Sequence, residues 1–345
     1  MNLRRDMILI YYTYAHFAVD FSCFYILFYL LNESCEMSKS VFVFLLYNII
    51  AFGLQVFIGA YYDKNRKEPL AILGTVLVFT GLLLNMLEVP FWGLIFAALG
   101  NAFFHVEGGC NTVLLSKGKF LPNGIFSSAG ALGVLAGSVL GGLYVPYPLL
   151  PMAFILPAFA FMMILWSSNR LSLLTGEPFK LGNVLKNETV LVYAILLCAV
   201  SQLSYSFVFI DKEDFIFIFL FYLCLSFGKI FGTYLMDELG VQKAVFICFL
   251  ISILSILAIN KNVMYISGMA FATSAFYNIA LGGLSNVFPK NTAFAFALTK
   301  TGLLLGVMPS YILSLLDMNI SFFVVEFSLL FVSFMLIWRM SKQTD

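Results

Sequence analysis

Charged residues are scarce in this chain, and their scarcity excludes most classes of protein. Only 11% of the 345 residues are charged, whereas 61% are hydrophobic; soluble domains usually carry about 25% charged residues. A water-soluble fold of this length could not hide so much apolar surface. The composition therefore excludes a soluble enzyme, a nucleic-acid-binding protein and a disordered chain. It leaves an all-α polytopic membrane protein.

Cysteine and histidine are also rare. The six cysteines form no CxxC pair and no cluster with the two histidines, His16 and His105, so we expect no disulfide framework, no metal site and no cofactor. Neither a Gly-x-Ser-x-Gly elbow nor an HExxH pair is present, and no catalytic residue is predicted. The apolar run after Arg4 and Arg5 is too long for a signal-peptide core, which predicts a retained first span.

Apolar runs long enough to cross a bilayer as helices, about 20 residues each, recur along the whole sequence. The runs are continuous rather than alternating, which favours helices over β-strands. Twelve spans are predicted, at residues 8–31, 40–62, 69–88, 91–115, 122–145, 149–168, 189–210, 215–236, 243–260, 262–285, 291–315 and 319–339.

The distribution of basic residues predicts the orientation in the membrane. With the N-terminus in the cytoplasm, fourteen lysines and arginines fall in cytoplasmic segments and three in external ones. Cytoplasmic loops normally carry this excess. We therefore expect a multi-pass protein of the cell membrane with both termini in the cytoplasm.

The longest polar break, residues 169–188, lies near the middle of the chain and is predicted to be cytoplasmic. It separates residues 1–168 from residues 189–345, which gives two bundles of six spans each. Residues 101–109 in the fourth span resemble residues 274–282 in the tenth, and this offset indicates an internal repeat. Two repeated six-span halves joined by a cytoplasmic loop are similar to the plan of the major facilitator transporters.

The loop after the second span resembles a signature of that superfamily, G-x-x-x-D-R-x-G-R-K. The matching residues are Gly59, Asp63, Lys64, Arg66 and Lys67, with Arg66 in place of the second glycine. An aspartate here can meet the positive N-terminus of another helix, and the basic residues can bridge to it or to lipid phosphate. A weaker copy after the eighth span contains Asp237. We expect a conformational latch; the alternative is an ordinary basic loop.

The fifth span resembles the antiporter signature G-x8-G-x3-G-P-x2-G-G, with Ser138 in place of the proline. Its glycines are Gly124, Gly133, Gly137, Gly141 and Gly142. Small residues four apart make a flat helix face that another backbone can approach closely. The resemblance implies a part in gating, whereas the simpler interpretation is a generic packing face. In the repeat, Gly130 of this span matches Gly302.

Several ionisable residues lie inside predicted spans, where each costs about 2.5–3.5 kcal/mol at a helix centre. By depth, Asp20, His105, Glu107 and Lys300 lie near the middle of the membrane. Lys229 is close enough to the cytoplasmic end to reach it with its side chain, and Glu326 lies nearer the outer face. So many embedded ionisable groups indicate either buried partners or a function.

The spacing of these residues predicts which way they face. His16 and Asp20 are four apart and share one face of the first span, as a proton-exchanging or a structural pair. Glu107 is about 200° around the helix from His105. We assign His105 to a central cavity and Glu107 to a neighbouring helix, with Lys300 as its candidate partner. A buried structural ion pair is the alternative role for Glu107.

A closer resemblance rests on two short motifs. Residues 16–20, His-Phe-Ala-Val-Asp, resemble the H-F-x-x-D opening of the fosmidomycin-resistance branch of the superfamily. Residues 104–107, Phe-His-Val-Glu, resemble its F-H-P-E, with Val106 in place of proline. This resemblance implies a drug exporter driven by proton entry. In the second half, only Gln202 and Asn278 offer neutral counterparts.

The sequence thus predicts an alternating-access transporter for a small organic solute or drug, with proton-coupled efflux, and a monomer whose partners are solute, protons and lipid. A central cavity would be lined by the first, fourth, seventh and tenth spans. Uptake by proton symport or facilitated diffusion is one alternative. A non-transporting membrane sensor or scaffold is another.

Overall fold

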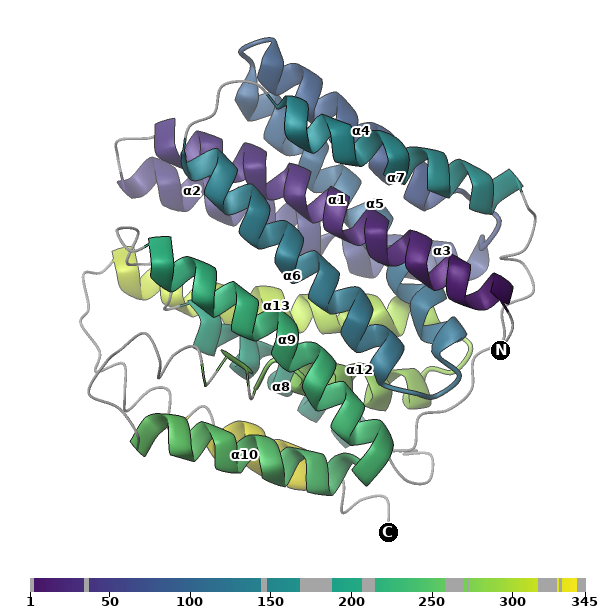
Figure 1. Cartoon of the computed structure of the whole chain (residues 1–345), viewed down its shortest axis with the longest axis vertical. Coiled ribbons are helices and arrows are strands. Elements are labelled where there is room, and N and C mark those ends of the chain that lie inside the picture. The colour runs from purple at the N-terminus through teal and green to yellow at the C-terminus, as the bar shows by residue number, and fades with distance from the viewer. Residues whose placement is uncertain are drawn as a thin grey trace.

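The computed structural model describes residues 3–33, 37–143, 148–167, 188–206, 215–257, 268, 270–271, 273–315, 328 and 331–339, and no strand occurs among them. The helices run roughly alongside one another (Figure 1). Their bounds are α1 Leu3–Glu33, α2 Met37–Asn48, the π-helix η1 Ile49–Gly53, α3 Gln55–Lys64, α4 Leu70–Met86, α5 Pro90–Ser116, α6 Leu121–Gly142, α7 Leu149–Ser167, α8 Glu188–Ser206, α9 Phe215–Leu239, α10 Val241–Leu257, α12 Phe276–Val287 and α13 Thr292–Leu315. Residues 331–339 are also helical.

The predicted all-α fold is confirmed, and most predicted spans match a helix to within a few residues. The second span, 40–62, is built from three pieces, α2, η1 and α3. The twelfth, 319–339, lies largely outside the described residues, as does Glu326. Six helical segments among the described residues are long and apolar enough to cross a membrane.

The surface of the molecule is apolar as well as its interior. Phe57 is 74% exposed and Leu149 is 65% exposed, and many other large apolar side chains share this outward position. So much exposed apolar surface would be unfavourable in water, whereas the lipid chains of a membrane would cover it. The chain is therefore a multi-pass membrane protein.

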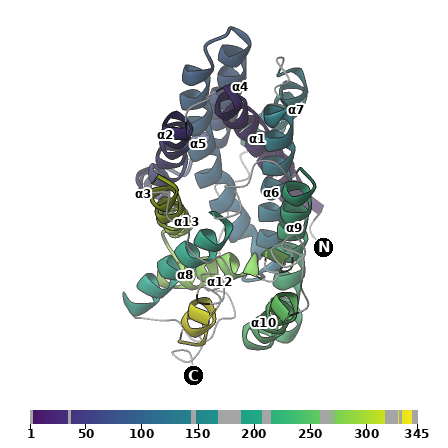
Figure 2. The ribbon, with the colours of Figure 1, turned by 90° about the vertical axis from the view of Figure 1, so that its left-hand side faces the viewer.

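Two groups of helices face each other across the molecule (Figure 2). Helices α1–α7 make up one side and α8–α13 the other. They meet where α6 packs on α9 and where α3 packs on α13, which also touches α5. Helices α6 and α9 are spans five and eight, and α3 and α13 belong to spans two and eleven. A twofold axis that exchanges each span with the one six places away would convert the first pair into the second. The predicted linker, 169–188, lies almost wholly outside the described residues.

Glycines bring the first helix and the sixth together. On α6, a Cβ atom added at Gly133, Gly137 or Gly141 would lie 2.4 Å from a carbonyl oxygen of α1. The spacing of four places these glycines on one face, as small residues at a close helix contact require. Gly142 instead has no atom within 4 Å of such a Cβ, and Gly124 faces α9. The α6 glycines thus split between packing within a half and packing between halves.

Short turns fix the antiparallel course of neighbouring helices. Lys117 and Gly118 both have positive φ angles, 52° and 72°, and this left-handed turn ends α5. Pro90 begins α5, where its missing N–H costs nothing. Gly240, with φ 83°, makes the corresponding turn between α9 and α10. These turns leave the ends of successive helices side by side.

Replacing Gly137 by alanine tests the contact between α1 and α6. The new methyl group would collide with the backbone of Phe21, so we expect Gly137→Ala to lower the free energy of unfolding by about 1–3 kcal/mol. Thermal unfolding in detergent measures the loss. Gly142→Ala is the matched control, because open space surrounds that position. Equal stability of the two variants would contradict the packing described.

Candidate functional site: a buried histidine–aspartate cluster

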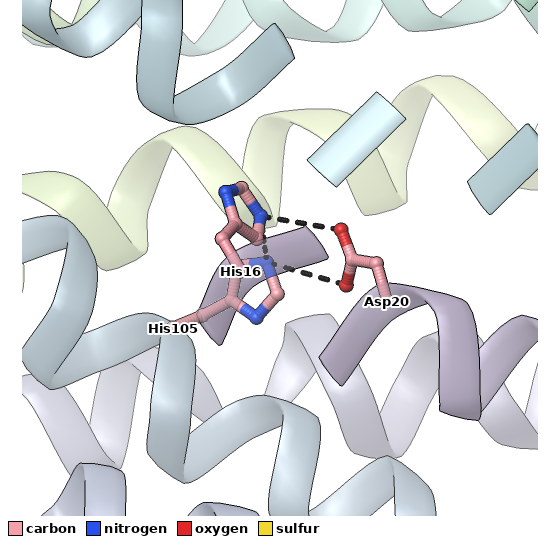
Figure 3. A group of neighbouring side chains, drawn as sticks. All are labelled: His16, Asp20 and His105. Carbon is pink, nitrogen blue, oxygen red and sulfur yellow. Dashed lines mark hydrogen bonds and ion pairs between the residues drawn. The ribbon is translucent and has the colours of Figure 1, made fainter. Parts of the chain in front are cut away.

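Three titratable side chains meet in the interior of the first half (Figure 3). His16 and Asp20 come from α1 and His105 from α5, and their exposed fractions are 3%, 6% and 2%. The Nε2 atoms of the two imidazoles are 2.8 Å apart. His16 Nε2 lies 3.2 Å from one Asp20 oxygen and His105 Nε2 lies 3.7 Å from the other. We name these three residues the histidine–aspartate cluster.

The outer side of the cluster is held by backbone and amide groups. His16 Nδ1 lies 2.7 Å from the carbonyl oxygen of Phe126, and His105 Nδ1 lies 2.9 Å from that of Asn101. The side-chain amide of Asn101 donates to Asp20 over 2.9 Å. Gly130 of α6 forms one wall, because an added Cβ would fall 2.4 Å from His16 Nε2 and 2.6 Å from Asp20. The cluster therefore depends on three helices, α1, α5 and α6.

The cluster offers one nitrogen from each histidine and a carboxylate oxygen, all within 4.8 Å of one another, which is a set of atoms that a metal ion could use. Two nitrogens bound to one tetrahedral ion at about 2.0–2.1 Å are separated by roughly 3.3 Å. The observed 2.8 Å is shorter than this and equals a hydrogen-bond length. The geometry thus fits a hydrogen bond between the rings better than a tetrahedral ion.

Glu107 faces away from the cluster, toward α4, as its angular offset from His105 predicts. One carboxylate oxygen accepts the backbone N–H of Ala71 at 2.8 Å, in the first turn of α4, and the other accepts the Tyr12 hydroxyl at 2.8 Å. Asn111 donates to Tyr12 in turn. A negative charge at a helix N-terminus is stabilised by the exposed N–H groups. Glu107 therefore caps α4.

The predicted partnership of Glu107 with Lys300 does not occur. Both carboxylate oxygens of Glu107 are taken by α4 and Tyr12. The Lys300 ammonium instead lies 5.0 Å from the ring centres of Tyr277 and Phe296, within range of a cation–π contact. Lys229 donates to the carbonyl oxygen of Ser127 across the two halves at 3.1 Å. The direct contacts of both lysines in the described part of the chain are thus with neutral groups.

Of the two predicted counterparts in the second half, only Asn278 has a described side chain, and it does not join the cluster. Gln202 lies in α8, and its side chain is outside the described residues. Asn278 lies in α12 and is 1% exposed; neither polar atom of its side chain makes a hydrogen bond within the described part of the chain. Tyr12 is a member of the polar network that sequence reasoning missed. Its position four residues before His16, on the same helix face, is the signal that could have found it.

The predicted latch residues make contacts between the halves. The Asp63 carboxylate at the end of α3 accepts the backbone N–H groups of Ala293 and Phe294, at 3.1 and 2.9 Å, in the first turn of α13. Arg66 donates to Asp63 at 3.0 Å and to the carbonyl oxygen of Lys290 at 3.1 Å. Gly59 allows the close approach, because an added Cβ would meet Ala293. Lys64 and Lys67 are exposed.

Asp237 repeats this contact with the halves exchanged. Its carboxylate, at the end of α9, accepts the backbone N–H groups of Phe120 and Leu121 at 2.8 and 2.9 Å, where α6 begins. The two contacts join span two to span eleven and span eight to span five. We call these two contacts the paired latches, and both join the halves at the end of the molecule where the basic loops lie.

Comparison with known proteins gives a fold but no close relative. No family model and no curated protein matches the sequence. Solved structures do match: a bacterial homologue of the iron transporter ferroportin in an outward-facing state (14% identity, TM-score 0.61, 99% of this chain and 98% of that one), the E. coli fucose:proton symporter (13%, 0.63, 99% and 98%) and the human organic anion transporter MFSD10 (15%, 0.69, 96% and 99%).

These similarities define the class to which the fold belongs. The fucose symporter is described, in its outward conformation, as a major facilitator superfamily transporter, and it aligns with the whole of this chain at a TM-score of 0.66. The chain has the major facilitator fold.

The position of Glu107 generates a test of its capping role. The Glu107 carboxylate accepts one hydrogen bond from Tyr12 and one from Ala71. In Glu107→Gln the amide NH₂ group would face one of these donors, and that buried hydrogen bond would be lost. We expect the free energy of unfolding to fall by about 1–3 kcal/mol, as measured by thermal unfolding in detergent. Glu68→Gln, at an exposed position, is the control. An unchanged unfolding temperature would argue against a capping role.

Proposed function

We propose that this protein is a secondary transporter of the major facilitator superfamily that moves a small organic solute by alternating access. The observation that carries the proposal is the pair of latches, which join the two halves at one end through twofold-related contacts. A protein whose halves rock about a central site needs such contacts at one end, made and broken in each cycle. A static scaffold has no need of them.

The strength of the latches suits a switch. A carboxylate at a helix N-terminus contributes about 0.3–1 kcal/mol and up to about 2 kcal/mol when partly buried. Two such contacts can favour the closed end by one or two orders of magnitude, since about 1.4 kcal/mol corresponds to a factor of ten. They are weak enough for solute or proton binding to overcome. The contacts thus bias the equilibrium without freezing it.

The direction in which the protein opens follows from its charge. The closed end carries the basic loops, and basic loops belong in the cytoplasm, which supports a cytoplasmic location for both termini. The described state is then closed to the cytoplasm, in agreement with the outward states of two of the similar structures. We infer that the cycle alternates between this state and one in which the latches are separated.

Coupling to protons is assigned to the histidine–aspartate cluster. Asp20, His16 and His105 are buried near the middle of the membrane, where an unpaired charge is costly. A change of protonation there changes the net charge that the buried cluster carries while the two halves reorient. Efflux driven by proton entry is our first choice, from the resemblance to the fosmidomycin-resistance branch. The contacts of the cluster do not set the direction, and proton-coupled uptake is the second choice.

Breaking the latches should open the closed end. Spin labels attached in Lys119→Cys and Lys243→Cys, in a background without the native cysteines, would report the distance between the halves there. We expect Asp63→Asn and Asp237→Asn each to reduce the closed population by a factor of about two to thirty. Electron–electron double resonance measures this population. Distances identical to the wild type in both variants, and in the double variant, would exclude the latch role.

The coupling role of Asp20 is tested by flux. A thermal-shift screen with fosmidomycin, fucose and a set of organic anions would identify a solute, and proteoliposomes with an imposed pH gradient would then measure its transport. We expect the gradient to drive accumulation of the solute by the wild-type protein. In Asp20→Asn this accumulation should be at least tenfold lower, while exchange of solute without a gradient continues. Glu68→Gln is the control.

Gradient-driven accumulation that survives in Asp20→Asn would remove the cluster from the coupling step. A wild-type protein that binds a solute but moves none would support a sensor instead. Accumulation against depletion of the same solute in whole cells then separates uptake from efflux.

A further inference from the structure

The hydrogen-bond partners of the two histidines determine where their protons lie. A backbone carbonyl can only accept, so Nδ1 of His16 must donate to Phe126 and Nδ1 of His105 must donate to Asn101. A neutral imidazole with its proton on Nδ1 carries a lone pair on Nε2. Two neutral rings would therefore direct lone pairs at each other across the 2.8 Å that separates their Nε2 atoms. That arrangement is repulsive, and it has no hydrogen bond.

One added proton removes the conflict. If either Nε2 is protonated, it donates to the other, and 2.8 Å is an ordinary length for that hydrogen bond. Protonating Asp20 instead would give the carboxyl group a donor, yet the two nitrogen lone pairs would still oppose each other. Protonating both rings would set two donors against each other. Among these states, only a single proton on the pair gives all four imidazole nitrogens a compatible hydrogen-bond partner.

We propose that His16 and His105 together bind one proton between their Nε2 atoms, with the Asp20 carboxylate as the counter-ion. The pair is then an imidazole hydrogen-bonded to an imidazolium, and the cluster as a whole is neutral. Its use in transport rests on the proposed function, but its presence does not. The proton-binding unit is thus the histidine pair, and Asp20 is a positioning residue that balances its charge.

No described contact places a neighbouring titratable group between the two Nε2 atoms. On α1 and α2, Cys23 and Tyr47 are near enough to interact with Asp20. On α9 and α13, Lys229 and Lys300 interact with Asp20 from the second half. From α6 the cluster meets no titratable group: Gly130 lies against it, and Phe126 contributes a backbone carbonyl and a ring stacked on His16. Glu107 of α5 is turned toward α4. The described contacts of these groups leave the space between the two Nε2 atoms to the rings themselves.

Loss of this proton would leave a strongly unfavourable site. Two lone pairs and a carboxylate would converge in a buried space, with the Asn101 amide as the donor the structure shows them. The rings belong to α1 and α5, so they can separate only if these helices or their side chains move. Proton release at this pair is thereby linked to the packing of α1.

The chain is well suited to a direct test, because His16 and His105 are its only histidines. The full-length protein, purified without a histidine tag and labelled with ¹⁵N-histidine, would be studied in lipid bilayers at pH 7.5 by solid-state NMR. A free histidine is about nine-tenths neutral at that pH. We expect protons on both Nδ1 atoms, one imidazolium per chain, and a ¹⁵N–¹⁵N coupling between the two Nε2 atoms.

Variants separate the pair from its surroundings. In His105→Gln and His16→Gln, the remaining ring should become neutral and the coupling should vanish. Asp20→Asn should reduce the imidazolium signal by at least half through loss of the counter-charge, while Gly142→Ala should match the wild type. The wild-type spectrum is decisive even if a variant fails to fold.

Three results would overturn the shared proton: two neutral rings in the wild type, an Nδ1 without a proton, or spectra that change when a chelator removes a bound metal. These results are independent of solute flux. If the protein shares a proton between its histidines but transports nothing, the proposed transport function is wrong and the proposed proton site stands. If a pH gradient drives flux while both rings are neutral, the transport function stands and the shared proton is wrong.

Discussion

The cost of placing a charge in lipid governs the interior of this protein. An ionisable group near the middle of a membrane is tolerated only when other groups replace its water. The described residues meet this demand in different ways. Glu107 is held by a helix N-terminus and a tyrosine hydroxyl, Lys300 lies against two aromatic rings, and Asp20 is surrounded by two histidines and an amide. Only the last arrangement requires a proton that can leave.

This difference distinguishes supporting residues from those suited to coupling. The partners of Glu107 come from neighbouring backbone and side-chain donors, so the carboxylate is satisfied while charged. The partners of Asp20 are bases, and their state changes when a proton arrives or departs. A transporter that uses proton energy needs a group of the second kind within a framework of the first. The first half of this chain contains both, and His105 and Glu107 represent them two residues apart on α5.

The sequence allowed the number and position of most helices to be predicted, because apolar runs and their polar breaks record the thickness of the membrane directly. It also predicted that Glu107 would face away from His105, since helical geometry fixes that angle. It could not show that His16 and His105 touch, because 89 residues separate them and helix periodicity says nothing of which helices are neighbours. The Lys300 partnership was wrong because a backbone amide of α4, invisible in a residue pattern, already occupies the carboxylate.

The latches have a consequence for how the sequence can change over time. On one side of each contact the donor is a main-chain N–H, which every residue type except proline supplies. The hydrogen bonds to the aspartates therefore exclude only proline at positions 120, 121, 293 and 294, although Phe120 and Ala293 are also buried. Proline already occupies position 122, one residue beyond the two amides that Asp237 requires. Comparisons among relatives should show an unchanging acid facing helix starts that carry no proline at these four positions.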